Sequence, residues 1–117
     1  MTLHAVLETS IFSRRADALL SREERMALIN ILARDPLAGD VMPGLGGVRK
    51  LRFAPKGRGK SGAFRVIYYV LTEKLPVIAL LIYGKNEQVN PTPEQTRAIE
   101  AAVADLRAAR ESTTRRR

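Results

Sequence analysis

Two nearly continuous apolar runs, residues 63–71 and 75–83, lie in the second half of the chain with only residues 72–74 between them. Both runs are rich in β-branched and aromatic residues, which favours strands over helices. Three residues are enough for a hairpin connection, so the runs are predicted to be adjacent antiparallel strands. Because both faces of each run are apolar, we expect these strands at the centre of a sheet that is covered on both sides.

The sequence before these runs predicts a short strand and two consecutive helices. Residues 3–7 are apolar with one polar interruption and are expected to form an edge strand. Apolar residues then recur at helical spacing over residues 12–20. Ser21 and Glu24 match a capping box, which would start a second helix that Pro36 ends. Two helices joined so closely are predicted to form a helical hairpin.

A charged strand and a C-terminal helix complete the prediction. Residues 48–53 alternate apolar and basic side chains, which is typical of a half-buried strand. The glycine-rich segment 37–47 before this strand is expected to be an irregular connection. Thr92 followed by Pro93 is a strong helix start, and one apolar stripe continues that helix to about Arg110.

The length of 117 residues fits one domain. The predicted order is β-α-α-β-β-β-α in a single α+β domain over residues 1–111, with an antiparallel sheet and a frayed basic tail at residues 112–117. No apolar run reaches the roughly 18–20 residues of a membrane span, so a cytoplasmic protein without a membrane partner is expected. There is no cysteine and only one histidine, and we expect neither a metal site nor a small-molecule cofactor.

Basic residues are concentrated in one part of the chain. Positions 49–65, here called the basic segment, contain seven basic residues and no acidic one, although the net charge of the whole chain is only +8. Such a cluster is typical of a protein that binds a polyanion, most often a nucleic acid, because charge runs that only improve solubility usually mix both signs. The seven residues are Arg49, Lys50, Arg52, Lys56, Arg58, Lys60 and Arg65.

Arg65 is unusual because it lies inside an apolar run. A guanidinium on a central strand is costly unless it is paired or opens onto a cleft. Strand periodicity places Arg65 on the same face as Ile67 and Tyr69. Two interpretations stay open: a structural ion pair with an acidic residue, or a phosphate clamp on the concave face of the sheet to which the rest of the basic segment contributes.

Three segments carry a more specific pattern. They read Gly-Val-Arg-Lys-Leu-Arg at residues 47–52, Gly-Arg-Gly-Lys-Ser-Gly-Ala-Phe-Arg-Val-Ile-Tyr-Tyr at residues 57–69, and Tyr-Gly-Lys-Asn-Glu at residues 83–87. In order and spacing they resemble the RelE/ParE toxin superfamily, and within it the HigB-like branch of RelE-type toxins. The resemblance covers nearly the whole chain.

The resemblance implies a RelE-like fold and the function of a type II toxin. Toxins of this kind enter the ribosomal A site and cleave the mRNA there until an antitoxin neutralises them. The implied partners are therefore the ribosome, its mRNA and a cognate antitoxin, expected to be a helix-turn-helix protein encoded next to the toxin.

The resemblance also assigns site residues. The strand arginine of the family falls on Arg65, and its basic residues on the preceding strand and loop fall on residues 52–60. A family motif of glycine, lysine and arginine after the last strand appears here as glycine followed by Lys85 and Asn86, so the arginine role is vacant or has moved to Lys85. The tyrosine that RelE itself uses near its C-terminus has no counterpart after Tyr83.

The chemistry is consistent with these residue types. RNA is cleaved without a metal ion when its 2′-OH attacks the adjacent phosphate, and the enzyme must align the attack, neutralise the phosphate oxygens and move two protons. Arginine suits bidentate phosphate binding, and a lysine surrounded by like charges loses its proton more readily. We therefore predict Lys56 or Lys60 as the base and Arg65 as the group that stabilises the transition state. Glu87 is a rival base, and Tyr69 or Tyr83 is a candidate acid.

These considerations define the predicted site. The predicted catalytic residues are Arg65, Lys56, Lys60, Arg58, Lys85, Glu87 and Tyr69. The predicted RNA- or phosphate-binding residues are Arg49, Lys50, Arg52, Arg58, Lys85 and Asn86. Two other functions stay open: a ParE-like toxin that inhibits DNA gyrase without cleaving RNA, and a non-catalytic RNA-binding module. The dense basic segment favours the nuclease, whereas the missing arginine and tyrosine favour the gyrase inhibitor.

Overall fold

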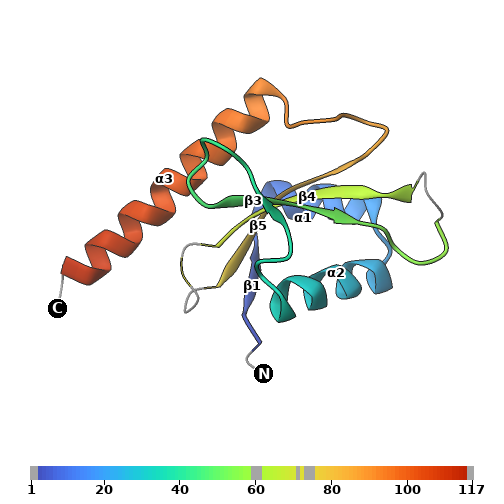
Figure 1. Ribbon diagram of the computed structural model, residues 1–117, viewed down its shortest axis with the longest axis horizontal. Helices are drawn as coiled ribbons and strands as arrows, with labels where there is room; N and C mark the ends of the chain where they lie inside the picture. Colours follow the sequence, from blue (N-terminus) through green and yellow to red (C-terminus); the bar gives the residue numbers. More distant parts are fainter. Residues whose placement is uncertain (1–2, 59–61, 71, 73–75, 116–117) are drawn as a thin grey trace.

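A five-stranded sheet in the order β1-β5-β4-β3-β2 forms the middle layer of the protein (Figure 1). The computed structural model describes residues 3–58, 62–70, 72 and 76–115, with side chains described as far as residue 111. Neighbouring strands are antiparallel except for β1, which runs parallel to β5. The strands are β1 (Val6–Glu8), β2 (Asp40–Val41), β3 (Val48–Phe53), β4 (Phe64–Tyr69) and β5 (Val77–Gly84).

The central pair of strands confirms the prediction from the two apolar runs. β4 and β5 are antiparallel neighbours, with Arg65 opposite Tyr83. A register shift occurs between Ile67 and Tyr68, yet the side chains keep alternating between two separate hydrophobic clusters. Ile67 and Tyr69 belong to one cluster and Tyr68 to the other. Arg65 therefore shares a face with Ile67 and Tyr69, as predicted.

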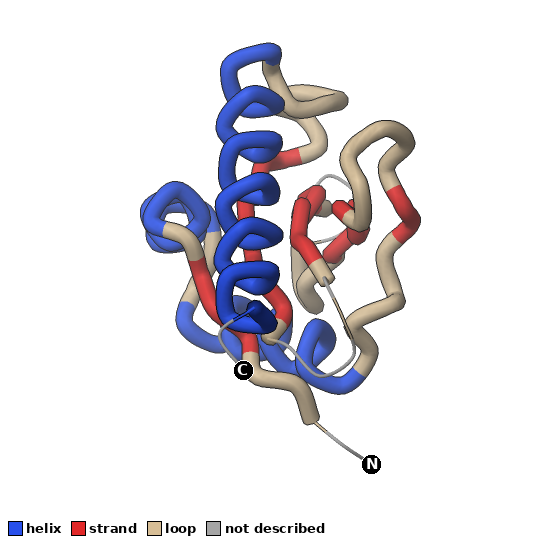
Figure 2. The backbone as a smooth tube through the Cα atoms, turned by 90° about the vertical axis from the view of Figure 1, so that its left-hand side faces the viewer, coloured by secondary structure: helices blue, strands red, loops and turns tan. Residues whose placement is uncertain are grey.

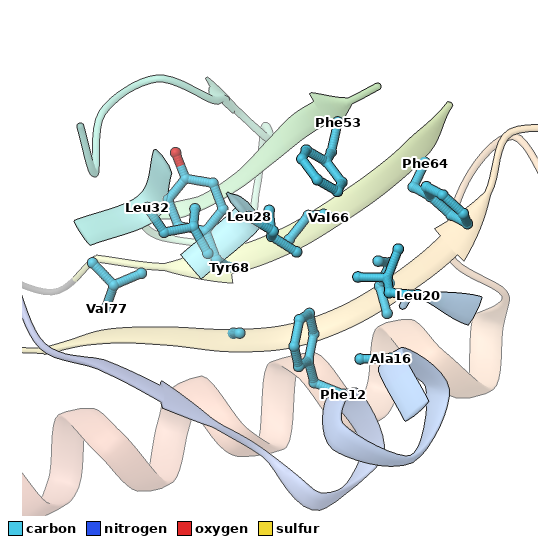
Figure 3. Packing of buried hydrophobic residues seen from close by; sticks show 12 residues of the cluster. Phe12, Ala16, Leu20, Leu28, Leu32, Phe53, Phe64, Val66, Tyr68 and Val77 are labelled. Carbon is cyan, nitrogen blue, oxygen red and sulfur yellow. The ribbon is translucent and has the colours of Figure 1, made fainter. Parts of the chain in front are cut away.

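Two consecutive helices cover the first face of the sheet. They are α1 (Ser10–Leu19) and α2 (Arg22–Arg34), and each has a polar cap at its N-terminus. The backbone N–H of Phe12 donates to the Thr9 side chain, and Ser21 with Glu24 forms the predicted capping box. These caps satisfy N–H groups that lack partners inside the helix. The apolar side of both helices packs on β4 and β5 around the cluster shown in Figure 3, which includes Phe12, Ala16, Leu28, Leu32, Val66 and Tyr68.

A long C-terminal helix covers the opposite face of the sheet. This helix, α3 (Pro93–Arg115), lies across the strands (Figure 2). Its Ile99 and Val103 belong to one hydrophobic cluster with residues of β4 and β5. It continues past the predicted end at Arg110, so the first residues of the predicted tail are helical. No helix in the described part of the chain is long and apolar enough to cross a membrane.

Two features of the sheet differ from the prediction. The first strand is parallel to its neighbour, and its backbone is fixed by hydrogen bonds from Val77 N to Ala5 O and from Thr9 N to Ala79 O. The intervening helices and strands provide the long crossover that a parallel pair requires. The second difference is β2, which lies within the segment predicted to be irregular and places Asp40 opposite Lys50.

Candidate functional site

Arg65 opens onto a surface cavity on the α3 side of the sheet. The cavity has a volume of about 530 Å³ and is also lined by Lys50, Arg52 and Asn90, with Asp40 as its acidic residue. Arg52 lies directly opposite Arg65 in the pairing of β3 with β4, and Lys50 is two residues earlier on the same strand. Because residues two apart in a strand share a face, the fold places three cations around one opening.

The guanidinium of Arg65 has an unsatisfied nitrogen. Its Nη1 is buried, and no described residue offers this atom a hydrogen-bond acceptor. None of the ion pairs among the described residues includes Arg65. The first interpretation, a structural ion pair of Arg65 with an acidic residue, is therefore not found among the described residues. A buried guanidinium nitrogen without a partner destabilises the fold, whereas the part of Arg65 that lines the cavity can contact a bound anion.

Lys50 holds the segment that follows β5 against this cavity. Its Nζ donates to Val89 O and to Asn90 Oδ1, both at 3.2 Å. The Tyr83 hydroxyl also donates to Val89 O, at 3.2 Å. Burial raises the pKa of this hydroxyl, and the charge of Arg65 opposes the rise. Lys50, predicted to bind phosphate, is thus already engaged in positioning residues 88–90.

Asn90, like Asp40, is a polar residue of this cavity that was not predicted from the sequence. It lies in a polar segment without periodicity, so no pattern singles it out. A topological signal does exist. β5 runs antiparallel to β4, so the chain leaves β5 near the start of β4, where Arg65 lies. The residues after Tyr83 are therefore brought close to Arg65 by the strand pairing alone.

Two predicted residues on the strands have structural partners instead of open positions. Tyr69 shares the face of Arg65, but it is only 1% exposed and its hydroxyl accepts a hydrogen bond from Arg107 Nε at 3.0 Å. Arg49 points to the opposite face, where its Nη1 donates to Gly39 O at 2.8 Å. The grouping of Arg49 with Arg52 and Arg65 is wrong, because side chains alternate between faces along β3.

Several other predicted residues line a second cavity of about 520 Å³ on the α1 side of the sheet. Arg58 is bound there to Glu24 at 2.6 Å, and its guanidinium lies 5.2 Å from the centre of the Phe64 ring. The single clamp predicted around Arg65 is therefore divided between two faces. The predicted residues in this second cavity are Arg58, Lys85, Asn86 and Glu87, and they are joined by Arg14 and Arg15.

Glu87, the rival base, is bound by a cation in this second cavity. Its carboxylate pairs with Arg15 at 2.5 Å. Burial would raise the pKa of Glu87, but hydrogen bonds from Arg15 and from the Gly84 N–H lower it overall. Lys56 is exposed on the loop after β3 and lines neither cavity, while Lys60 lies outside the described residues. No group of three or more metal-binding side chains occurs in the described part of the chain.

Solved structures share this arrangement of helices and strands, whereas no protein-family model matches the sequence. A mutant of E. coli toxin RelE in the free state, with two arginines changed to alanine, is similar over 88% of this chain and 99% of its own, with a TM-score of 0.60 and 16% identity. The chain has the RelE fold. The RelBE2 toxin-antitoxin complex from Mycobacterium tuberculosis contains a chain similar over 70% of this chain and 98% of its own, with a TM-score of 0.52 and 20% identity.

The RelE fold confirms the architecture that the sequence resemblance implies. At this level of identity the likeness concerns the fold, and the HigB-like branch stays a prediction. The cavity around Arg65 and the second cavity lie on opposite faces of this fold, on either side of β4.

The ion pair between Glu24 and Arg58 gives this RelE-like fold a pH-dependent contact. Hydrogen bonds from Arg58 and from the Ser21 N–H lower the pKa of Glu24 from 4.5 to about 2. The folded state therefore gains stability from the ionised carboxylate above pH 4.5 and loses it as the pH falls toward 2. We expect Glu24→Gln to lower the melting temperature at neutral pH, and the variant and wild-type values to converge near pH 2.

Thermal unfolding followed by circular dichroism from pH 2 to 7 measures this effect. Glutamine at position 24 can keep the capping box, so the change isolates the charge. Glu23→Gln is the matched control, because Glu23 lies on the same helical turn and has no ion pair among the described residues. A difference between Glu24→Gln and wild type that does not change with pH would contradict the prediction.

Proposed function

We propose that this protein is the toxin of a type II toxin–antitoxin system and that it cleaves mRNA in the ribosomal A site. The RelE fold supports the toxin function. The observation that carries the nuclease activity is the cavity that Arg65 lines together with Arg52, its direct neighbour on β3, while none of the ion pairs among the described residues includes Arg65. Such a site is suited to the phosphate of an RNA backbone.

The proposed reaction uses the 2′-OH of the RNA itself. The bond between the 2′ oxygen and phosphorus forms while the bond from phosphorus to the 5′ oxygen breaks, which leaves a 2′,3′-cyclic phosphate. Arg65 and Arg52 bind the phosphate oxygens, on which negative charge increases in the transition state. The base that takes the 2′-OH proton stays the predicted Lys56 or Lys60, with the other lysine, still protonated, supplying the proton for the leaving 5′ oxygen. This assignment rests on the sequence prediction, because Lys56 is exposed on the loop after β3 and Lys60 lies outside the described residues.

An antitoxin partner fits the same surface. One structural neighbour comes from a toxin-antitoxin complex, and the predicted partner of this chain is a helix-turn-helix antitoxin encoded next to it. The basic segment would be complementary to an acidic region of that antitoxin. Binding over Arg65 would exclude the RNA phosphate and so neutralise the toxin.

Induced expression of the chain in bacteria tests the proposal. We expect a rapid block of protein synthesis, measured by labelled amino-acid incorporation, together with mRNA cut at sites occupied by ribosomes, measured by mapping of RNA 5′ ends. Co-expression of the adjacently encoded protein is the control and should restore synthesis. A DNA-damage response with intact mRNA would instead indicate the gyrase inhibitor, and a weak effect on both would indicate a non-catalytic RNA-binding module.

A further inference from the structure

The segment from Gln88 to Asn90 forms a fixed wall of the Arg65 cavity. Lys50 and Tyr83 both donate to the carbonyl oxygen of Val89, as described above. Gln88 Nε2 donates to Asn90 O at 3.0 Å and to Gln95 Oε1, in the first part of α3, at 2.7 Å. These bonds hold the segment from β3, β5 and α3 at once. A contact made from this wall therefore needs little ordering when a ligand binds.

The orientation of the Asn90 amide follows from its bond to Lys50. An ammonium group can only donate, so the oxygen Oδ1 faces Lys50 and the amide nitrogen Nδ2 faces away from it. No described residue accepts a hydrogen bond from Nδ2. Asn90 is exposed and lines the cavity that contains Arg65. The amide thus presents an uncharged donor next to the two arginines.

This donor is better matched to a nucleobase than to a phosphate. Arg52 and Arg65 are charged donors and compete more strongly for phosphate oxygens. Guanine O6 and uracil O4 are acceptors, whereas adenine and cytosine carry amino donors at the corresponding positions. An asparagine whose oxygen is free can bind adenine through both amide atoms, but the oxygen of Asn90 is occupied by Lys50. The cavity volume of about 530 Å³ lies within the common range for small-ligand sites, about 300–1,000 Å³.

We propose that Asn90 is a specificity-determining residue that donates from Nδ2 to the carbonyl oxygen of guanine or uracil beside the phosphate bound by Arg65. The inference rests on the proposed nuclease function and adds a base preference to it. Guanine or uracil is favoured at one position next to the cleaved bond. Adenine and cytosine are disfavoured there because their amino groups face another donor.

Substitution of Asn90 distinguishes this role from general binding. Asn90→Asp replaces the donor with an acceptor, and Asn90→Ala removes both. With ribosome-bound mRNA carrying a randomised A-site codon, we expect wild type to favour guanine or uracil by about 2- to 12-fold, in keeping with one hydrogen bond. Asn90→Ala should lose the preference, and Asn90→Asp should shift it toward adenine or cytosine. Sequencing of the cleaved 5′ ends measures all three.

Asn30→Asp is the matched control, because it makes the same change at an exposed position of α2 and should keep the wild-type preference. Melting curves confirm that each variant is folded. If wild type cleaves but the Asn90 variants keep its base preference, the role of Asn90 is overturned and the nuclease function stands. If wild type cleaves no RNA, the nuclease function fails. The role of Asn90 is then tested by the binding of uncleavable 2′-O-methyl oligonucleotides. Equal affinity for guanine/uracil and adenine/cytosine sequences overturns the proposal. A base preference that Asn90→Asp reverses supports it.

Discussion

Arg65→Met is expected to reduce RNA cleavage by about 10²–10³-fold, the usual cost of removing one preorganised donor for transition-state charge, without lowering the melting temperature. Methionine keeps an unbranched apolar side chain beside Ile67 and Tyr83 but cannot bind a phosphate. It also removes the buried Nη1 that has no described partner. Removing an unsatisfied buried group relieves a desolvation cost, so stability should be unchanged or higher. Activity and stability are thus predicted to separate at this position.

Initial rates of ribosome-dependent mRNA cleavage and thermal unfolding curves test this separation. Arg97→Met is the matched control, because Arg97 is an exposed arginine of α3 that lines neither cavity. The control should keep both activity and stability. Cleavage by Arg65→Met at the wild-type rate would show that Arg65 is not a catalytic residue. A large fall in melting temperature would show that the guanidinium is a structural element instead.

Phe12→Ala is expected to lower the free energy of unfolding by about 3–5 kcal/mol, the range found when a buried phenylalanine is truncated. Phe12 is 0% exposed and belongs to the cluster that joins α1 to the sheet (Figure 3). The substitution leaves a cavity among well-packed side chains and also removes apolar area from the interior. α1 is the element most affected.

Urea denaturation measured by circular dichroism gives this change directly. The neighbouring Ile11 is the matched control, because it lies on the same helical turn but is 40% exposed. Ile11→Ala should cost much less, about 0.5 kcal/mol, as is usual for surface positions. Equal losses for the two variants would show that α1 does not pack through Phe12.

The elements with long and regular patterns could be predicted from the sequence. The two apolar runs correspond to β4 and β5. The alternation along residues 64–69 correctly predicts which of their side chains lie on each face of the sheet. β2 could not be found because two residues carry no periodicity. The parallel pairing of β1 was also missed, since the partner of an edge strand depends on which sheet edge the helices leave open. Both failures concern contacts that no local pattern records.

The candidate site was predicted less completely than the fold. The clamp predicted around Arg65 included the whole basic segment, and of its strand residues the structure places Arg52 directly opposite Arg65. The partner of a long side chain does not follow from the sequence pattern. Arg58 binds Glu24, 34 positions away in the chain, so its place on the α1 face is decided by tertiary packing. The same applies to Asn90, because its position in the Arg65 cavity depends on the path of the chain after β5.

The parallel pairing of β1 with β5 also governs the order in which the chain can fold during its own synthesis. Thr9 Oγ1 donates to Leu80 O across 71 positions of the chain, so β1 cannot take its place until β5 has left the ribosome. Contacts this distant in sequence form late and slowly. The wall formed by residues 88–90 and the cover provided by α3 are made later still. A protein proposed to attack translation thus completes its site only when nearly all of it has been translated.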